Sequence, residues 1–371
     1  MRNNSKKASE AVTGKMTMGL DLGDRYSYYY SLDDEGQNVE SGRVKTSREA
    51  MEKRFGGGEP MRVVIEAGTH SPWVSRLLAG MGHEVIVANP RKVRLISDND
   101  GKDDPVDAEL LARLGRVDVR LLSPIEHRGE AAQADLAVIR ARDALVAART
   151  QLVNHVRGAV KSLGSRLEKS SARSFAGKMG DQVPEALRAA LEPVLEVIAE
   201  ITNQIGGYDQ QIRRCCQEKY PETQLLTAVP GVGALTALGY VLTLEDPHRF
   251  AHSRSVGSFL GLRPGKDKSG QQDPELRITK AGSPLLRRLL VGSAQYLLGP
   301  FGPDTDLRRW GLKLAGRGRK NAKKRAVVAV ARKLAVLLHR LWVHGEVYEP
   351  LYQSERTAAR SAQACSVQSG V

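Results

Sequence analysis

The sequence predicts an α/β domain followed by a mostly helical remainder, and three observations lead to this fold class. Residues 15–125 alternate short apolar runs with amphipathic segments, as strands and helices do when they follow one another along a chain. Residues 126–220 carry long helical periodicity, and residues 221–350 contain short helical segments joined by glycine-rich turns. The ends, residues 1–14 and 351–371, lack such patterns and are predicted to be disordered tails.

Three strands open the first region. "MTMGLDLGD" is a short apolar run, and "RYSYYYSLDD" and "NVESGRVKT" alternate as two further strands around the turn "DDEGQ". The helix "SREAMEKRF" precedes the buried strand "MRVVIEAG", and the helix "SPWVSRLLAGMG" precedes the strand "HEVIVAN". Helices are then predicted for "PRKVRLI" and, after a polar turn, for "DDPVDAELLARLGR". This order is that of the ribonuclease H-like fold, in which the first strand lies beside the fourth.

Four carboxylates occupy positions that this order of elements brings together. Asp21 ends the first strand, Glu66 ends the fourth, and Asp104 and Asp107 share the first turn of a late helix, where they face the same way. Since like charges repel, such a group needs a divalent cation, and oxygen ligands suit Mg²⁺ or Mn²⁺. A single Asp at a helix start is more often a cap than a ligand, so the prediction depends on the set of four.

The middle region, residues 126–220, predicts two long helices packed as a coiled-coil hairpin. From Leu187 to Ile212 the apolar residues alternate steps of four and three, which is typical of a coiled-coil seam. Pro193 and Gly206-Gly207 predict kinks or breaks within this second helix. Periodicity leaves open whether the seam lies inside one chain or between two copies. In the first helix, apolar residues recur every seven positions at Ile139, Val146, Val153 and Val160.

Positive charge dominates the chain and is concentrated near its C-terminus. The chain has 56 Lys and Arg against 42 Asp and Glu, a net charge of +14. From Leu307 to Gly345 there are twelve Lys or Arg and no acid, a basic stripe that indicates binding to nucleic acid. A basic balance alone would also fit ribosomal or membrane-surface proteins. The candidate nucleic-acid contacts are Lys280, Arg287, Arg288, Arg317, Arg319, Lys320, Lys323, Lys324 and Arg325.

Several classes of protein are disfavoured by the sequence. The three cysteines form no C-x-x-C pair, which argues against a structural zinc and against a disulfide framework. Charged residues interrupt the apolar run at 326–342, so a membrane span is not expected. The N-terminal "MRNNSKKASEAVTGK" has charge but no apolar core and does not resemble a signal peptide. We therefore expect a cytoplasmic protein.

Two loops of the C-terminal region have features of interest. "PGVG" between two short helices resembles half of a helix-hairpin-helix element, whose glycine amides can accept a phosphate, although a plain connection fits equally well. Ser269 lies in a loop rich in glycine and lysine before "RITKAGSPLLRRLL". Taken alone, a Ser-Gly pair in a polar loop predicts only a turn.

Together these segments resemble the insertion-sequence 110 family of DEDD transposases, over about residues 15–350. "GLDLGD", "VVIEAG" and "KDDPVDAELLA" are similar to the RuvC-like domain of that family. "AVPGVG", "FLGLRPGKDKSG", "ITKAGSPLLRRLL" and "AVARKLA" are similar to its C-terminal transposase domain, which would span residues 221–350. One departure is Ser283 in "KAGS", where the family is expected to favour Asn.

The resemblance implies roles for particular residues. Asp21, Glu66, Asp104 and Asp107 would be the catalytic tetrad that binds Mg²⁺, and Ser269 would be the nucleophile that becomes joined to a DNA phosphate. The resemblance also implies donor and target DNA as substrates, a structured element-encoded guide RNA (a bridge RNA) as a partner, a dimer or tetramer, and action at the bacterial nucleoid. The expected function is that of a transposase that cuts and rejoins DNA strands.

Other functions share parts of this pattern. A metal-dependent, RuvC-like junction-resolving nuclease, the main alternative, would keep the tetrad and have no use for Ser269. A non-catalytic nucleic-acid scaffold would need only the basic stripe. An actin-like or sugar-kinase ATPase would begin with a similar hairpin, but the second phosphate hairpin and the adenosine loop of that class are not found in the sequence.

Overall fold

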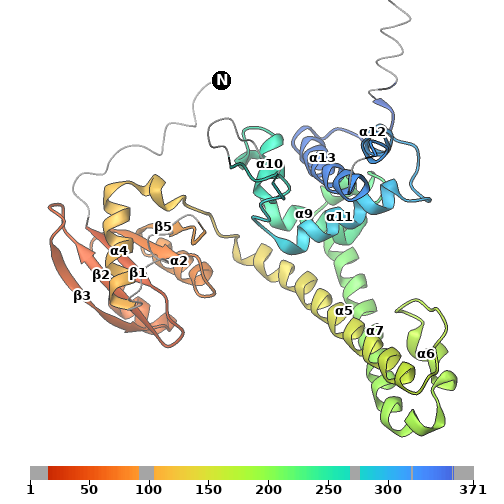
Figure 1. Ribbon diagram of the computed structural model, residues 1–371. Helices are drawn as coiled ribbons and strands as arrows, with labels where there is room; N and C mark the ends of the chain where they lie inside the picture. The colour runs from red at the N-terminus through yellow and green to blue at the C-terminus, as the bar shows by residue number, and fades with distance from the viewer. Residues whose placement is uncertain (1–15, 92–103, 268–275, 319–320, 353, 355–371) are drawn as a thin grey trace, which may run out of the picture. The chain divides into compact units, whose positions relative to one another are not determined.

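The computed structural model divides into two compact units, Met1–Arg128 and Gly129–Val371, and Figure 1 shows the elements of each. Within the described part of the chain, no helix combines the length and the hydropathy needed to cross a membrane. The residues that the structure describes are 16–91, 104–267, 276–318, 321–352 and 354.

A mixed five-stranded sheet organises the first unit. Its strands follow the order β3-β2-β1-β4-β5, with β1 antiparallel to β2 and parallel to β4. The prediction that the first strand lies centrally beside the fourth is therefore confirmed. Aromatic and β-branched residues fill these strands, which suits a pleated surface covered by helices. The strands are β1 (Thr17–Asp21), β2 (Tyr26–Leu32), β3 (Asn38–Lys45), β4 (Arg62–Glu66) and β5 (Glu84–Ala88).

Helices cover both faces of this sheet, as Figure 1 shows. Helices α1 (Arg48–Phe55) and α2 (Ser71–Gly80) pack on the face that carries Met18 and Leu20 of β1. Helix α4 (Asp104–Val117) packs on the opposite face, through a small core that includes Leu111. The predicted helix "PRKVRLI" falls mostly on residues outside the described part of the chain.

Two glycines allow α4 to lie directly on the sheet. A Cβ atom on Gly19 of β1 would lie 2.0 Å from the Ala108 carbonyl oxygen, and a Cβ on Gly115 would lie 2.2 Å from Cγ2 of Val64. Gly115 also lies over Thr17, the first residue of β1, whereas Ala108 lies over its middle. Helix α4 therefore runs opposite to β1, and its first turn reaches the end of the strand.

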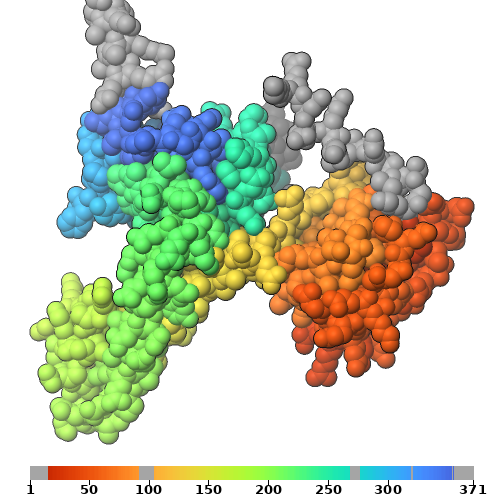
Figure 2. Space-filling model, turned by 180° about the vertical axis from the view of Figure 1, so that it is seen from behind, coloured from red at the N-terminus to blue at the C-terminus, as the bar shows by residue number. Residues whose placement is uncertain are grey.

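A helical hairpin opens the second unit. Helices α5 (Glu130–Ser162) and α7 (Glu185–Glu218) pack side by side, and their hairpin, with α6 (Phe175–Met179) near its tip, projects from the rest of this unit (Figures 1 and 2). Arg142 binds Asp209 at 2.6 Å, and Arg149 binds Thr202 at 3.2 Å. Residue numbers therefore rise along α5 while those of the contacting residues on α7 fall. The hairpin is therefore antiparallel, and α5 and α7 of the same chain pack against each other. Its coiled-coil character stays a prediction.

Helix α7 runs without interruption through Pro193 and Gly206-Gly207, so a break at these residues is wrong, whereas a kink stays a prediction. Pro193 is exposed, whereas Leu191, Ile198 and Ile205 are buried along the hairpin. The prediction rests on the intrinsic cost of Pro and Gly inside a helix. Most of the stability of a helix in a protein, however, comes from packing of its apolar face. Burial of the seam outweighs the local cost.

Helices of different lengths form the rest of the second unit around α9, which is buried along almost its whole length. The Tyr240 hydroxyl of α9 donates a 2.6 Å hydrogen bond to the Ala335 carbonyl, which fixes α9 to α13. The predicted pair of short helices flanking "PGVG" is confirmed, and Gly231 takes a positive φ of 82° in the turn. These helices are α8 (Thr223–Thr227), α9 (Ala234–Leu244), α10 (Arg254–Phe259), α11 (Pro284–Leu298), α12 (Asp306–Ala315) and α13 (Ala322–His344).

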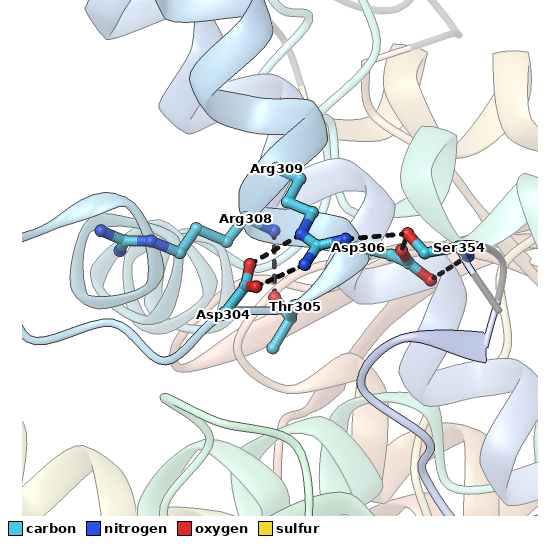
Figure 3. A network of polar contacts seen from close by, with 6 residues as sticks. All are labelled: Asp304, Thr305, Asp306, Arg308, Arg309 and Ser354. Atoms are coloured by element: carbon cyan, nitrogen blue, oxygen red, sulfur yellow. Dashed lines mark hydrogen bonds and ion pairs between the residues drawn. The ribbon is translucent and has the colours of Figure 1, made fainter. Parts of the chain in front are cut away.

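Polar contacts fix the start of α12, as Figure 3 shows. The Thr305 hydroxyl accepts a 3.0 Å hydrogen bond from the Arg308 amide and so caps the helix. Arg309 forms two hydrogen bonds with Asp304, at 2.9 and 2.6 Å, and a third with Ser354 at 3.3 Å. Through Ser354, this network attaches the segment that follows α13 to the start of α12.

Candidate active site

Two acidic side chains lie at the same edge of the sheet of the first unit. The parallel register of β1 and β4 pairs Gly19 with Val64 and Leu20 with Ile65, so Asp21 and Glu66 follow as the last residues of neighbouring strands. Since side chains alternate between faces, Asp21 lies on the face of Gly19, and Glu66 lies on the face of Val64. Both belong to the face that α4 covers.

Helix α4 brings two more carboxylates to this edge. Asp104 begins the helix, and Asp107 lies in its first turn. Asp104 is four residues before Ala108, which sits on Gly19, so Asp104 extends the sheet-facing stripe of the helix toward the end of β1. The two aspartates come from sequence positions far from Asp21, and only the packing of α4 places them nearby.

Electrostatics show that the four carboxylates are neighbours. Burial raises the pKa of Asp21 from 3.8 to about 6, and repulsion from Asp104, Asp107 and Glu66 adds to the effect. A hydrogen bond from the Leu22 amide acts in the opposite direction. Burial and repulsion from Asp107 also raise the pKa of Glu66. Asp21 and the three acids whose charges act on it therefore form an unusual concentration of negative charge at one edge of the sheet.

The donor set suits a divalent cation that binds through oxygen. Carboxylate oxygens are ligands for Mg²⁺ and Mn²⁺, whereas zinc sites usually include Cys or His. In the described part of the chain, no three His, Cys, Asp or Glu side chains form a group already close enough to hold a metal. The four carboxylates are thus within repulsive range without being gathered around one point, and neutralisation by a cation would remove the repulsion that separates them.

Asp24, three residues after Asp21, does not share this environment. Its side chain is 95% exposed, and its carboxylate lies 3.5 Å from His70 Nε2. Asp24 is absent from the charges that raise the pKa of Asp21. It therefore offers a matched acidic position outside the cluster.

Ser269, the predicted nucleophile, lies outside the described residues. Ser283, the departure from the expected motif, caps α11 by accepting a 3.3 Å hydrogen bond from the Leu286 amide. Asn and Ser are comparable N-caps, so this departure is physically conservative.

The predicted nucleic-acid contacts fall into different environments. Arg287 donates hydrogen bonds to the carbonyls of Leu260, at 3.0 Å, and Ala281, at 2.6 Å. These contacts lie within the second unit and stabilise its fold. Arg288 pairs with Asp143 at 2.6 Å. Arg288 is exposed despite this ion pair, as are Lys280, Arg317, Lys323, Lys324 and Arg325, whereas Arg319 and Lys320 lie outside the described residues.

Other members of the basic stripe also have partners inside the second unit. Arg308 donates to the Gly299 carbonyl at 2.6 Å, and Lys333 lies over the Trp310 ring at 4.2 Å from its centroid. Arg309 is held by the network of Figure 3. The start of α13, with Lys323 and Lys324, is an exposed part of the stripe.

Sequence analysis did not single out the tyrosines beside the acids. In the register of β1 and β2, Tyr28 stands directly opposite Asp21, and Tyr30 stands opposite Gly19. Alternation along "YSYYYSL" puts these two tyrosines on the face of Asp21 and Tyr29 on the other face. The turn "DDEGQ" joins β2 to β3 and does not fix the pairing of β2 with β1. The sequence alone therefore does not predict that Tyr28 lies opposite Asp21.

Comparisons with known proteins agree over most of the chain. A model of DEDD transposases of the IS110 type matches residues 18–164, and a second model, described as "Transposase IS116/IS110/IS902 family", matches residues 223–305. The transposase for insertion sequence element IS1111A of Coxiella burnetii is 28% identical over 351 residues, which cover 92% of this chain and 94% of that protein.

Two further relatives have similar descriptions. The putative transposase y4pF/y4sB of Sinorhizobium fredii is 31% identical over 324 residues, which cover 82% of this chain and 79% of that protein. The probable family 20 transposase of Pseudomonas aeruginosa is 26% identical over 343 residues, 90% of this chain and 98% of that protein. The acids at the ends of β1 and β4 and in the first turn of α4 all lie within the first matched segment. The chain therefore belongs to the insertion-sequence 110 (IS110) family of transposases.

Proposed function

We propose that the chain cuts and rejoins DNA strands with Asp21, Glu66, Asp104 and Asp107 as a Mg²⁺-binding tetrad and Ser269 as the nucleophile. A transposase family transfers DNA strands, and this coarser function follows from membership. The observation that carries the finer proposal is that β1, β4 and α4 bring four carboxylates to one edge of the sheet, where burial and repulsion from the other three raise the pKa of Asp21 to about 6. The strand order and the position of α4 support a ribonuclease H-like, RuvC-like fold for residues 15–125.

The four carboxylates would hold the cation from one edge of the sheet. Asp21 and Glu66 offer oxygens from adjacent strand ends, and Asp104 and Asp107 offer oxygens from the turn of α4 above them. When bound there, Mg²⁺ (or Mn²⁺) supplies positive charge that stabilises the charge developing on a phosphate during strand transfer. The rigid sheet fixes Asp21 and Glu66, and the close contact of α4 with Gly19 fixes the other pair.

The role of Ser269 is a proposal that comes from the family resemblance. In that step the Ser269 oxygen forms a bond to the DNA phosphorus, and the bond from phosphorus to one deoxyribose oxygen breaks. The serine loses its proton, and the released deoxyribose oxygen takes one up. Attack by the hydroxyl of a second DNA strand reverses the step, restores the serine and forms a new phosphodiester. One phosphodiester replaces another, so strands are rejoined without a separate source of energy.

The second unit would bind the nucleic acids. The exposed Lys323 and Lys324 at the start of α13 continue the basic stripe, and backbone contacts of this kind give affinity without reading sequence. We propose that sequence is read by a structured guide RNA that pairs with donor and target DNA, as pairing does in other RNA-guided enzymes. Residues 126–220 would act as a coiled-coil spacer in a dimer or tetramer that acts at the nucleoid.

The tetrad is tested by replacing Asp104 with Asn. Asp104→Asn keeps the size of the side chain but removes one anionic ligand, so we expect Mg²⁺-dependent DNA cleavage to fall by about 10²- to 10³-fold. Cleavage of element-end DNA by the complete protein, with its RNA, measures the effect. Asp24→Asn is the matched control and should cleave like the unchanged protein. Equal cleavage by the two variants would remove Asp104 from the proposed site.

The serine step separates the transposase from a junction-resolving nuclease. Ser269→Ala should abolish the covalent protein–DNA adduct, visible as a shifted band on a denaturing gel, and should abolish strand exchange. Binding of nucleic acid should be retained, because the basic stripe is unchanged. If Ser269→Ala still cuts DNA at the full rate with Mg²⁺ and yields free phosphate ends, the hydrolytic nuclease is the correct function.

A further inference from the structure

A groove of about 320 Å³ lies next to Asp21 and the first turn of α4, on the face of the sheet that α4 covers. One wall comes from the first turns of α4, and the other comes from β2 and β3. Its volume is at the lower end of the range of about 300–1,000 Å³ that small-molecule pockets occupy. The lining residues used below are Tyr28, Tyr30, Arg43, Pro105, Val106 and Glu109.

Strand register connects this groove to the acids. Tyr28 of β2 stands opposite Asp21 of β1, and Arg43 of β3 stands opposite Tyr28. Residues directly opposite one another in neighbouring strands project from the same face, with Cβ atoms about 4.5–5.5 Å apart. An acid, an aromatic ring and a cation therefore form one row across three strands, and the groove follows this row away from Asp21.

The charges of the groove favour an anion next to the acids. Glu109 pairs with Arg113 at 2.6 Å, so its negative charge is balanced within α4. Arg43 is exposed, and its guanidinium lies over the Tyr26 ring, 4.9 Å from the centroid. Among the residues that the structure describes, no carboxylate forms an ion pair with Arg43.

Two tyrosine rings add an aromatic surface to the groove. Tyr28 and Tyr30 are half-buried, and Pro105 and Val106 face them from the turn of α4. An aromatic surface with an arginine at one end matches a nucleotide unit, which has a planar base and an anionic phosphate. A base paired in a duplex has its faces covered by its neighbours, so stacking on Tyr28 requires an unpaired nucleotide.

We propose that this groove holds one unpaired nucleotide of the DNA strand that is cut, with its base against Tyr28 and its phosphate against Arg43. The inference rests on the proposed function, since the groove is read as the continuation of the site at Asp21. It adds a substrate requirement, a locally unwound strand next to the cut, and two positioning residues. Tyr28 and Arg43 hold the strand so that the adjacent phosphate lies at the acids.

Fluorescence of a stacked base tests the proposal directly. The probe is a single-stranded oligothymidylate that carries one 2-aminopurine, added to the complete protein with Ca²⁺ in place of Mg²⁺. Stacking quenches this base, so we expect quenching by the unchanged protein and by Tyr28→Phe, which keeps the ring. Tyr28→Leu should lose the quenching and bind about tenfold more weakly. Quenching and affinity that survive in Tyr28→Leu would overturn the stacking role.

The phosphate contact has its own variant and control. Arg43→Gln should lower the slope of the logarithm of the binding constant against the logarithm of the salt concentration by about one. Arg48→Gln should leave this slope unchanged, because Arg48 is exposed and pairs with Glu52. An unchanged slope in Arg43→Gln overturns the phosphate contact. This variant carries the test if Tyr28→Leu does not fold, as judged by its thermal unfolding.

Cleavage separates this inference from the proposed function. Tyr28→Leu should raise the KM for DNA about tenfold and leave kcat within about twofold, because the residue positions the strand and does not react. Quenching by a protein that does not cleave with Mg²⁺ would reject the proposed function and keep the groove as a nucleotide site. Normal cleavage with an unchanged KM in Tyr28→Leu would reject the groove and keep the tetrad.

Discussion

Asp21→Asn is expected to stabilise the metal-free protein at neutral pH while abolishing its strand transfer. The carboxylate of Asp21 has a pKa of about 6 in the folded chain, against an ordinary 3.8, so the folded state disfavours its charge. One pKa unit corresponds to about 1.4 kcal/mol. Because Asp21 is partly exposed, solvent screens its charge, and the charge lowers the free energy of unfolding by about 1–2 kcal/mol. Asparagine carries no charge, so both the cost of burying a charge and the repulsion from Asp104, Asp107 and Glu66 disappear in the variant.

The same reasoning gives the dependence on pH. At pH 3 Asp21 is protonated in both states and the charge has no effect on stability. Between 3.8 and about 6 the folded chain binds more protons than the unfolded chain, so the free energy of unfolding falls as pH rises. Above that range Asp21 is charged in both states, and its charge lowers the free energy of unfolding by the full amount. The unchanged protein should therefore lose stability from pH 4 to pH 7 more steeply than Asp21→Asn does.

Chemical denaturation in EDTA, at a series of pH values, measures this difference. Addition of Mg²⁺ should then reverse the order, because a ligand that binds only the folded state stabilises it by mass action. The unchanged protein should gain from Mg²⁺, and Asp21→Asn should not. Asp24→Asn is the control, since its exposed carboxylate pairs with His70 outside the cluster. Identical pH profiles for Asp21→Asn and Asp24→Asn would contradict the repulsion that the geometry indicates.

Local patterns were sufficient to predict the position of the acids. Asp21 and Glu66 end short apolar runs, and Asp104 and Asp107 follow a polar turn, so their places in the elements depend only on nearby residues. Their convergence needed one further step, the order of the elements, which restricts the sheet to few arrangements. Sequence reasoning was reliable wherever neighbours along the chain decide the outcome.

Long-range partners were beyond the same reasoning. Arg288 looks like part of a basic face, yet its partner Asp143 lies 145 residues away in α5. Arg287 binds carbonyls of Leu260 and Ala281 that become neighbours only after folding. Pro193 looks like a break because its cost is local, whereas the packing that overrides it comes from α5. Each discrepancy arises where a contact with a distant segment outweighs a local preference.

Gly19→Ala is expected to disrupt both the fold and the site of the first unit. The added Cβ would lie 2.0 Å from the Ala108 carbonyl oxygen and 2.5 Å from the Ala112 nitrogen, and neither backbone atom can turn aside. Helix α4 must then move off the sheet. Overpacking of this kind costs about 3 kcal/mol, and a shift of about 1 Å in a catalytic group lowers the rate by about 10²-fold. Asp104 and Asp107 would move with the helix.

Gly115→Ala provides a sharper comparison, because its added Cβ meets a side chain. That atom would lie 2.2 Å from Cγ2 of Val64, and Val64→Ala removes the obstacle. The double variant Gly115→Ala/Val64→Ala should therefore recover part of the stability and activity that Gly115→Ala loses. Gly19→Ala should gain nothing from Val64→Ala, because its conflict is with the backbone.

Gly57→Ala serves as the control for both glycines, since its added Cβ meets nothing within 4 Å. Thermal unfolding and Mg²⁺-dependent cleavage are measured for the whole set. Full activity of Gly19→Ala would mean that α4 does not need to lie against β1, and Asp104 and Asp107 would then have no reason to meet Asp21. Rescue of Gly115→Ala alone, with Gly19→Ala inactive, would establish that direct contact between α4 and the sheet assembles the four acids.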